Sequence, residues 1–589
     1  MAIARVANPS TWRTQASDAS VRGDRKALRE LANSPAVKRL PTSSLLLIAS
    51  ALTSTGMGDR AVDLLRKVQR ERPGDFWTNL ELGLLLCEQQ QPRHDQAIHY
   101  FAIAVALRPA SPGARLNFGS ALYEKGQLEE AIAEFREAIR LKKDLPLAHY
   151  NLGLALHRKG ALEEAIAEYR QTIRLKKDLP LAHNNLGLSL KAKGLLDDAI
   201  EAYHKAIDLD PKCAPAHVNL GNALREKGRL DDAIAEYREA IRIKPDSAEA
   251  HYNLGCALSD TGSVDERIAE YRKAIRIKHD YAEAHYNLAN ALSAEGDIDG
   301  AMAEYREAIL LNKHLSKPRN NLGNILRKRG DLNGAIAEFR QAINLKNDNP
   351  EAHFSLAQAL RDQGRFAESL EAVKRGHELR SRYPRWLYPS AQYLHDCEYL
   401  LELDRKLPAF LSGELEPANL AERICLAQLC HLPCKKLYAT AARLYAEAFA
   451  ANPPPADQPV VQRYNAAGAA ALASCGQGKD ADQTDDKERV RLRRQALEWL
   501  RADLAAWRQL LEKEPDKARP VVRRQMRHWQ QDKDFAGVRG PEALAQLAEA
   551  ERAEWSKLWQ EVAALGKQAA EGKGDQQNST PPRKEVPDK

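Results

Sequence analysis

The sequence predicts an all-α repeat protein, and two observations carry this prediction. The first is a glycine that returns every 34 residues through eight copies with no insertion: Gly126, Gly160, Gly194, Gly228, Gly262, Gly296, Gly330 and Gly364. The second is the apolar spacing around each glycine, which follows the i, i+3, i+4, i+7 pattern of amphipathic helices. A fixed period of this size is typical of a solenoid, in which each unit buries its apolar face against its neighbours. Such a chain is expected to hold other molecules on a surface.

Each repeat is predicted to contain two helices. In the repeat that begins at Pro146, the first helix carries His149, Leu152 and Leu156 on one face. Gly160 is expected to end this helix, because glycine tolerates a positive φ. Pro146 is expected at the first helical position, where the missing N–H costs nothing.

Small residues recur where two helices are predicted to cross closely. At the eighth repeat position they are Gly119, Gly153, Gly187, Gly221, Gly255, Ala289, Gly323 and Ala357. Large aromatic residues are predicted to fill the space beyond them: Phe135, Tyr169, Tyr203, Tyr237, Tyr271, Tyr305 and Phe339. Small and bulky positions in a fixed register are what close helix packing requires.

This framework of Leu-Gly, Gly, Ala, Tyr or Phe, Ala and Pro over 34 residues resembles the tetratricopeptide repeat (TPR) family. The resemblance implies ten repeats over 42–383, regular from 112, in an α-solenoid that winds as a right-handed superhelix. It also implies that the first helices line the concave side. Residues 1–41 are expected to form an N-terminal helical cap or a degenerate repeat.

The 34-residue period fails past Pro384, although helical patterning persists. We therefore expect a divergent, TPR-like helical region over 384–565 and a disordered tail over 566–589. The text "YNAAGAAALASCGQGKDADQTDDKERVRLRRQALEWLRADLAAW" resembles the end of planctomycete-type bacterial proteins in which a serine/threonine kinase precedes a TPR array. The chain lacks the Gly-rich loop and the H-R-D motif of a kinase, so we expect no enzyme activity and no catalytic residues.

Composition narrows the class of partner. The net charge of +7 is small against 88 basic and 81 acidic side chains, so it gives no nucleic-acid signature. The apolar run Leu45 to Leu52 is too short to span a bilayer, and the eight scattered cysteines suit a reducing compartment. We expect a cytoplasmic bacterial protein that binds neither nucleic acid nor membrane and needs no cofactor.

An asparagine at the sixth repeat position provides the candidate peptide-binding site. It recurs in seven successive repeats, at Asn117, Asn151, Asn185, Asn219, Asn253, Asn287 and Asn321. Equivalent residues of neighbouring repeats are expected roughly 10 Å apart, and an extended peptide advances about 3.3 Å per residue, so each amide would meet about every third peptide residue. The array resembles the TPR region of eukaryotic O-GlcNAc transferases, which implies binding of peptide main chain. The alternative is that the amides bond within the solenoid and stabilise it.

Aromatic and basic residues flank this asparagine ladder. They are Tyr150, Tyr252 and Tyr286 at the fifth position, and Lys191, Arg225, Arg327 and Arg361 at the twelfth. Such a groove would favour an extended, somewhat acidic peptide, although these charges also suit a solvated surface. The TPR clamp for chaperone tails needs a lysine at the fifth position, and none of the eight regular repeats has one.

Two sets of possible metal ligands are predicted to be structural. The recurring histidines, His149, His183, His217, His251, His285 and His353, fall one per repeat, too far apart to share an ion at zinc's bond length of about 2 Å. Cys425, Cys430, His431 and Cys434 are the only compact soft-ligand cluster, but no second ligand pair follows it. Buried thiols are the favoured interpretation, and no metal site is expected.

Three functions are compatible with the sequence. The favoured one is a non-catalytic scaffold that binds extended segments of partner proteins in its concave groove. The alternative is a substrate-recruiting portion or partner of a bacterial serine/threonine kinase, which an in-frame kinase sequence upstream would support. A glycosyltransferase-associated protein ranks last, because the region after the array has no nucleotide-binding α/β pattern. The oligomeric state stays open.

Overall fold

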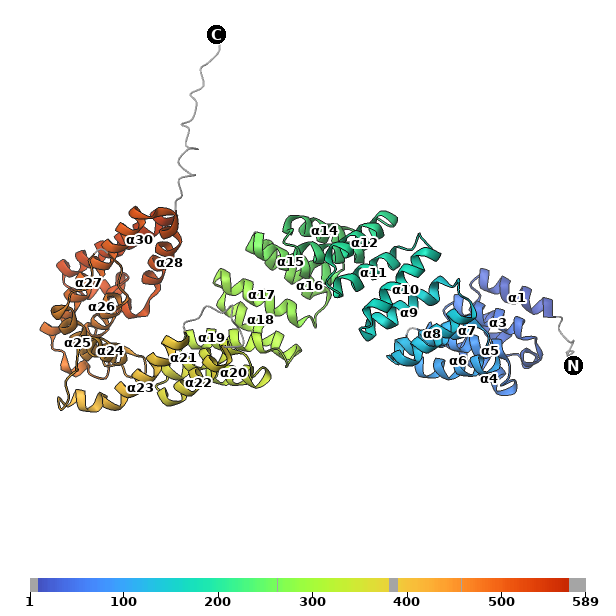
Figure 1. The fold of residues 1–589 in the computed structure, drawn as a ribbon, viewed down its shortest axis with the longest axis horizontal. Helices are drawn as coiled ribbons and strands as arrows, with labels where there is room; N and C mark the ends of the chain where they lie inside the picture. The colour runs from blue at the N-terminus through green and yellow to red at the C-terminus, as the bar shows by residue number, and fades with distance from the viewer. Residues whose placement is uncertain (1–8, 90, 262, 381–389, 457, 571–589) are drawn as a thin grey trace, which may run out of the picture. The chain divides into compact units, whose positions relative to one another are not determined.

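The chain is all-helical in the computed structural model, which describes residues 9–89, 91–261, 263–380, 390–456 and 458–570 (Figure 1). Within those ranges no β-strand occurs, so the predicted all-α solenoid class is confirmed. Two compact units divide the chain, Met1–Asp297 and Ile298–Lys589, and the division falls inside the repeat that spans 282–315.

Unit 1 begins with four helices and a 3-10 turn that precede the regular array. Their bounds are α1 (Pro9–Val21), α2 (Arg25–Asn33), η1 (Pro35–Arg39), α3 (Thr42–Ser54) and α4 (Gly58–Glu71). Leu28, Leu45 and Leu52 are fully buried and join these helices in one core. The division of the chain at residue 41 into cap and repeat stays a prediction.

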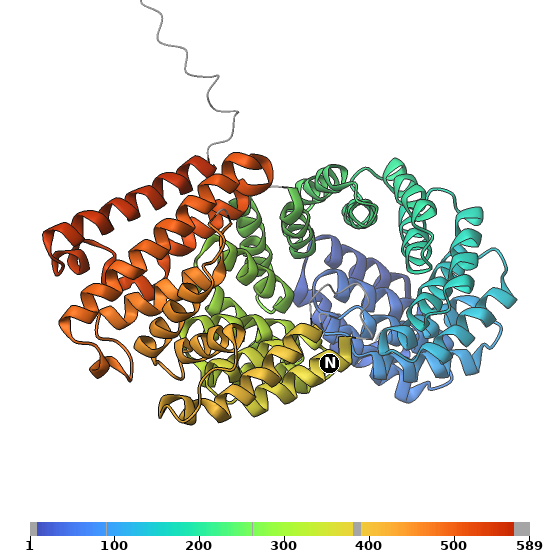
Figure 2. The same cartoon turned by 60° about the vertical axis from the view of Figure 1, so that its left-hand side comes forward.

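The rest of unit 1 consists of helix pairs that follow one another in a row (Figure 2). The first helices are α5 (Phe76–Cys87), α7 (Pro112–Lys125), α9 (Pro146–Lys159), α11 (Pro180–Ala192), α13 (Ala214–Glu226), α15 (Ala248–Thr261) and α17 (Ala282–Glu295). The second helices are α6 (His94–Leu107), α8 (Leu128–Leu141), α10 (Leu162–Leu175), α12 (Leu196–Leu209), α14 (Leu230–Ile243) and α16 (Val264–Ile277).

The recurring glycines end the first helices as predicted. Gly160 has φ +85°, and the N–H groups of Gly160 and Ala161 close the helix on the carbonyls of His157 and Leu156. A residue with a side chain adopts this left-handed conformation only with strain. Gly126, Gly194, Gly228, Gly296, Gly330 and Gly364 also have positive φ, whereas Gly262 lies outside the described residues.

Helix crossings depend on the glycine at the eighth position. A Cβ atom added to Gly153 would lie 2.7 Å from the buried ring of Tyr169, and Gly187 stands in the same relation to Tyr203. The rings therefore pack directly on the glycine backbone, as the alternation of small and large residues predicted. Leu152, Leu156 and Ala165 complete the core at this crossing.

The first helices form the inner side of the unit 1 array. Each packs on the first helix of the next repeat, α7 on α9, α9 on α11, α11 on α13 and α13 on α15, in addition to its own second helix. On α9 the buried positions are the third, fourth, seventh, eighth, tenth and eleventh. The second, fifth, sixth, ninth and twelfth positions consequently share the opposite, open face, which carries the asparagine ladder.

Unit 2 continues the repeats and then departs from them. The repeat helices are α18 (Ile298–Leu311), α19 (Ser316–Arg329), α20 (Leu332–Leu345), α21 (Pro350–Asp362) and α22 (Phe366–Arg380). The helices that follow are α23 (Ser390–Leu411), α24 (Leu420–His431), α25 (Tyr438–Ala451), α26 (Val461–Ser474), α27 (Asp486–Lys513), α28 (Pro515–Gln531), α29 (Pro541–Ala545) and α30 (Glu549–Ala570), with 3-10 turns η2 (Ala481–Gln483) and η3 (Lys533–Val538). The predicted end of the array near Tyr383 lies outside the described residues.

The C-terminal helices share one core built around fully buried Trp529 and Trp555. A buried ion pair joins α26 to α27, with Arg463 3.4 Å from Asp503, whose carboxylate also accepts the N–H of Val460. Helix α30 continues through Ala570, so the first residues of the predicted tail are helical. The rest of that tail, 571–589, lies outside the described residues.

Candidate peptide-binding groove

The recurring histidines tie each first helix to the loop that precedes it. His149 Nε2 lies 3.0 Å from the carbonyl oxygen of Lys143, six residues earlier in the chain. The same bond joins His217 to Pro211 and His251 to Pro245. Other residue types at this fourth position make it too, among them Arg115, which donates to the Pro109 carbonyl. This fourth-position bond explains why a donor side chain recurs there.

The other ring nitrogen of His149, His217 and His251 reaches a glutamate on the second helix of the same repeat. Nδ1 of His149 lies 2.6 Å from Glu168, and Nδ1 of His217 lies 2.6 Å from Glu236. The hydrogen bond to Glu168 is the main cause that raises the pKa of His149, against the effect of its burial. Where alanine replaces the glutamate, as at Ala202, burial instead lowers the pKa of the facing His183.

The asparagines of the ladder donate hydrogen bonds backward, to the preceding repeat. Asn185 donates from Nδ2 to the Tyr150 hydroxyl at 2.8 Å, and Asn287 donates to the Tyr252 hydroxyl at 3.1 Å. The corresponding bonds elsewhere are Asn151 to Ser120 Oγ, Asn219 to Asn184 Oδ1 and Asn321 to the Tyr305 hydroxyl. Asn253 is buried, and Asn117 is half-buried.

These bonds give the asparagine amides a structural role and also fix their orientation. Tyr150 and Tyr252, predicted as peptide contacts, hold the amides of Asn185 and Asn287 in place. An amide offers two donors and one oxygen with two lone pairs, so one backward bond does not exhaust it. Stabilising the solenoid and contacting a ligand are therefore compatible for the same side chain.

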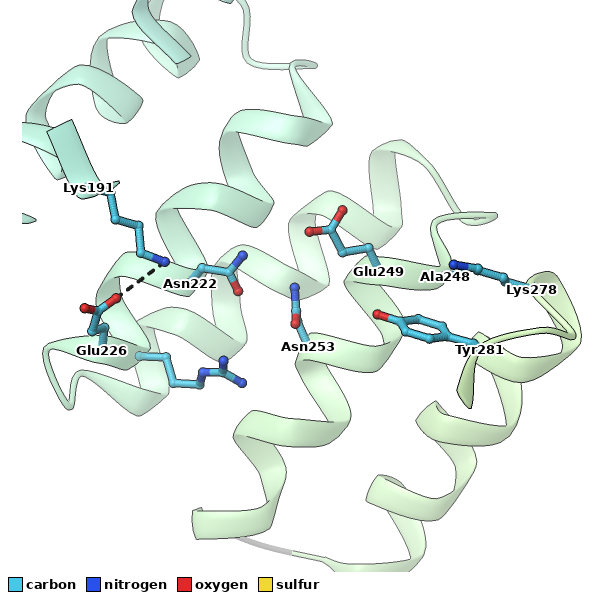
Figure 3. A pocket seen from close by; sticks show the side chains of 9 residues that line it. Lys191, Asn222, Glu226, Ala248, Glu249, Asn253, Lys278 and Tyr281 are labelled. Carbon is cyan, nitrogen blue, oxygen red and sulfur yellow. Dashed lines mark ion pairs between the residues drawn. The ribbon is translucent and has the colours of Figure 1, made fainter. Parts of the chain in front are cut away.

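A pocket of about 590 Å³ opens on the face that carries the ladder (Figure 3). It spans three successive first helices: Lys191 comes from α11, Asn222 and Arg225 from α13, and Asn253 from α15. The loop after α16 supplies Tyr281. Figure 3 shows Asn253 between Asn222 and Tyr281. Three residues of the predicted site, Lys191, Arg225 and Asn253, thus line one pocket.

Both charge signs occur in this pocket. Lys191 Nζ lies 3.4 Å from a carboxylate oxygen of Glu226, and Glu249 adds a second acid. Lys278 stands over the ring of Tyr281, with Nζ 4.8 Å from the ring centroid. Arg225 also lines the pocket, so Lys191, Arg225 and Lys278 stand there with Glu226 and Glu249.

The remaining predicted residues are not among those that line this pocket. Arg327 and Arg361 belong to α19 and α21 of unit 2, where Arg327 forms an ion pair with Asp362 at 2.7 Å. Tyr286 is half-buried on α17. Sequence reasoning missed Asn222, at the ninth position, although its spacing of three and seven from the sixth and second positions marks the same helix face.

No group of three His, Cys, Asp or Glu side chains that could hold a metal ion occurs in the described part of the chain. Cys430 is fully buried, and burial raises the pKa of its thiol to about 12. Nε2 of His431 lies 3.1 Å from Asp534. Among the helices that the structure describes, none has the length and apolar character needed to cross a bilayer.

Protein-family models for repeats match much of the array. The model described as TPR repeat matches 119–160, 155–194, 221–262, 257–296 and 323–364. Two models described as tetratricopeptide repeat match 180–213 and 282–315. The chain therefore contains tetratricopeptide repeats, a class of module that binds other proteins. No curated protein matches the chain at a significant level.

Several solved structures are similar to parts of the chain. MamA is 26% identical over 28% of this chain and 95% of its own, with a TM-score of 0.26. YrrB, described as a TPR protein with an unusual peptide-binding site, is 23% identical over 31% of this chain and 95% of its own, with a TM-score of 0.27. PilF of Pseudomonas aeruginosa is 20% identical over 36% of this chain and 97% of its own, with a TM-score of 0.34.

Proposed function

We propose that this protein is a non-catalytic scaffold that binds an extended segment of a partner protein along the open face of its first helices. One observation carries the proposal: ladder asparagine Asn253 lines a pocket built from three successive repeats. A ligand that contacts several repeats at once has to be long and extended. The tetratricopeptide repeats support the same class of function.

The asparagine ladder would contact the main chain of that segment. The backward bonds of Asn185 and Asn287 hold their amides in one orientation before any ligand binds. Groups ordered in advance lose less conformational entropy on binding, so their contacts contribute more to affinity. Main-chain contacts are independent of peptide sequence, and the pocket would add selectivity through Arg225 and Tyr281.

The charges of the pocket favour a segment that alternates in charge over one that is uniformly acidic. Lys191 is paired with Glu226, and Glu249 lies on the same lining. Arg225 would attract one carboxylate of the ligand, and Glu249 would accept a donor or a basic side chain. Summed over several repeats, such weak contacts give useful affinity without one dominant residue.

Site-specific photocrosslinking tests this proposal. Peptides selected on the intact protein from a random library serve as ligands, and p-benzoylphenylalanine replaces Asn222 in the groove. The matched control carries the same crosslinker at Ala235, an exposed residue on α14 outside the groove. Crosslinks at position 222 and none at 235 are expected. Selected peptides that crosslink at 235 and not at 222 would overturn the groove as the binding site.

A further inference from the structure

Two neighbouring repeats of unit 1 share a seven-residue sequence at the edge where one repeat passes to the next. The text "LKKDLPL" occurs at 141–147 and again at 175–181. Each copy leaves the end of a second helix and enters a first helix, α9 or α11. Because the helices of a repeat are antiparallel, the start of α9 lies beside the end of α10, and both copies meet at one edge.

The leucines of this edge are exposed without a structural need for them. Leu147 is 57% exposed, Leu181 is 47% exposed and Leu175 is 36% exposed, while Leu145 and Leu179 are half-buried. None of the five packs on the core of these repeats. At the repeat position of Leu147 and Leu181, later repeats carry Glu249 and Glu283 instead. These five leucines form what we call the leucine rim.

Unpaired positive charge flanks the leucine rim. Lys142, Lys143, Lys176 and Lys177 are all exposed, and none forms an ion pair with the residues that the structure describes. Many other charged side chains of the array are paired, for example Lys159 with Glu129 and Lys193 with Glu163. Helices α9 and α11 begin without an acidic residue in the first turn, and each copy sets two lysines against one exposed acid, Asp144 or Asp178.

The spacing of the two copies matches the rise of an α-helix. Equivalent residues of adjacent repeats lie roughly 10 Å apart, given helix packing distances. Seven residues of an α-helix advance about 10.5 Å. Apolar residues at i and i+7 of a bound helix would therefore meet Leu147 and Leu181 together. Acidic residues on both sides of that apolar face would lie against the lysine pairs.

We propose that the leucine rim is a second docking surface, which takes an amphipathic helix with acidic flanks from a partner protein. This surface borders the groove, because Leu147 and Leu181 occupy the second repeat position, which Glu249 occupies in the lining of the pocket. Leu147 and Leu181 would supply apolar contact, and the four lysines would supply orientation and salt dependence. A partner that occupies groove and rim with different segments would bind with higher overall affinity.

Fluorescence anisotropy with a designed peptide tests the proposal on the full chain. The probe is a labelled helix with leucines at i, i+4, i+7 and i+11 and glutamates beside them. We expect saturable, salt-sensitive binding that weakens at least about tenfold in the Leu147→Glu, Leu181→Glu double variant. Both changes install glutamate, which already stands at this repeat position as Glu249 and Glu283. The variant is therefore expected to fold. Leu310→Glu, at a 65% exposed leucine of unit 2, is the matched control and is expected to bind normally.

A charge swap makes the test specific. Changing Lys142, Lys143, Lys176 and Lys177 to glutamate is expected to abolish binding of the glutamate-flanked helix and to allow binding of a lysine-flanked one. Failure of the probe to bind, or equal binding by the double variant, would overturn the proposal. So would rim-dependent binding to phosphatidylserine vesicles, or rim-dependent dimerisation in sedimentation, without binding of the helix.

Discussion

His149 and Glu168 form an ion pair between the two helices of one repeat, with Nδ1 of the ring 2.6 Å from Oε2 of the carboxylate. The other nitrogen, Nε2, lies 3.0 Å from the carbonyl oxygen of Lys143. Both partners are acceptors, so the arrangement is best satisfied when the ring carries both protons. His217 repeats the arrangement with Glu236 and Pro211.

Histidines at the same repeat position are expected to have pKa values shifted in opposite directions. The hydrogen bonds to Glu168 and Glu236 raise the pKa values of His149 and His217 above 6.5. Burial lowers the pKa values of His183 and His353 below it. NMR titration of histidine-labelled protein, assigned by single His→Gln variants, measures these values. Four coincident titration curves would contradict the assigned role of the glutamates.

The Glu168 pair is expected to stabilise the repeat mainly at low pH. Because the folded-state pKa of His149 is raised, its contribution is complete below the unfolded value of 6.5 and is lost as pH rises through the folded value. Glu168→Gln should therefore lower the urea midpoint clearly near pH 6 and only slightly near pH 9. A loss that grows with pH would contradict this. For His183 the sign is reversed: its contribution is lost as pH falls below 6.5.

The two helices that cross at Gly153 are expected to leave no room for even one added methyl group. Gly153→Ala would place Cβ 2.7 Å from the Tyr169 ring and should cost about 1–3 kcal/mol of stability. Tyr169→Leu removes the ring atoms that clash, so the double variant should recover part of that loss. A double-mutant cycle on thermal unfolding measures the coupling. Additive effects would mean that the ring does not limit the crossing.

Removing only one member of the buried ion pair between Arg463 and Asp503 is expected to lower the stability of the C-terminal core. Arg463→Met leaves the buried Asp503 carboxylate with no cation and should destabilise the C-terminal core by about 3–5 kcal/mol. Burial raises the pKa of Asp503, so this penalty should shrink as pH falls toward the folded value. Unfolding followed by tryptophan fluorescence measures the loss. Adding Asp503→Asn should restore part of the stability lost in Arg463→Met. If it restores none, the unpaired Asp503 charge is not the cause of the loss.

The pairing of Lys191 with Glu226 is expected to limit the affinity of the groove for acidic ligands. Glu226→Gln frees the lysine, so an acidic peptide selected on the groove should bind roughly two- to fivefold more tightly. Calorimetric titration measures the change. The amidated, uncharged version of the same peptide is the control and should be unaffected. Equal gains for both peptides would show that the effect is not electrostatic.

The repeat framework could be predicted from the sequence because each part of it is local. Gly160 must reverse the chain within two residues, and Gly153 faces a ring sixteen residues away in the same hairpin. The shared face of the asparagines also follows from helix periodicity alone. Each of these features needs only the geometry of one helix pair.

Contacts between repeats could not be predicted in the same way. The bonds from Asn185 to Tyr150 and from Lys191 to Glu226 join residues 35 positions apart. Which atoms meet over that separation depends on the stagger between neighbouring helix pairs, which the period does not give. The sequence therefore places the asparagines on one helix face, whereas the pairing of Lys191 with Glu226 is known only from the structure.

The role of the ladder amides is tested most directly by comparing two double variants. One loses the hydrogen bonds from the amides to the preceding repeat, and the other loses the amides themselves. Tyr150→Phe with Tyr252→Phe removes the hydrogen bonds from Asn185 and Asn287 to the tyrosine hydroxyls and keeps the amides and the rings. Asn185→Ala with Asn287→Ala removes the amides. Affinity for one selected peptide should fall modestly in the first variant, which loses only the ordering of the amides, and about tenfold or more in the second. Equal affinity in the two variants would contradict a ligand-binding role and leave the ladder as reinforcement of the solenoid.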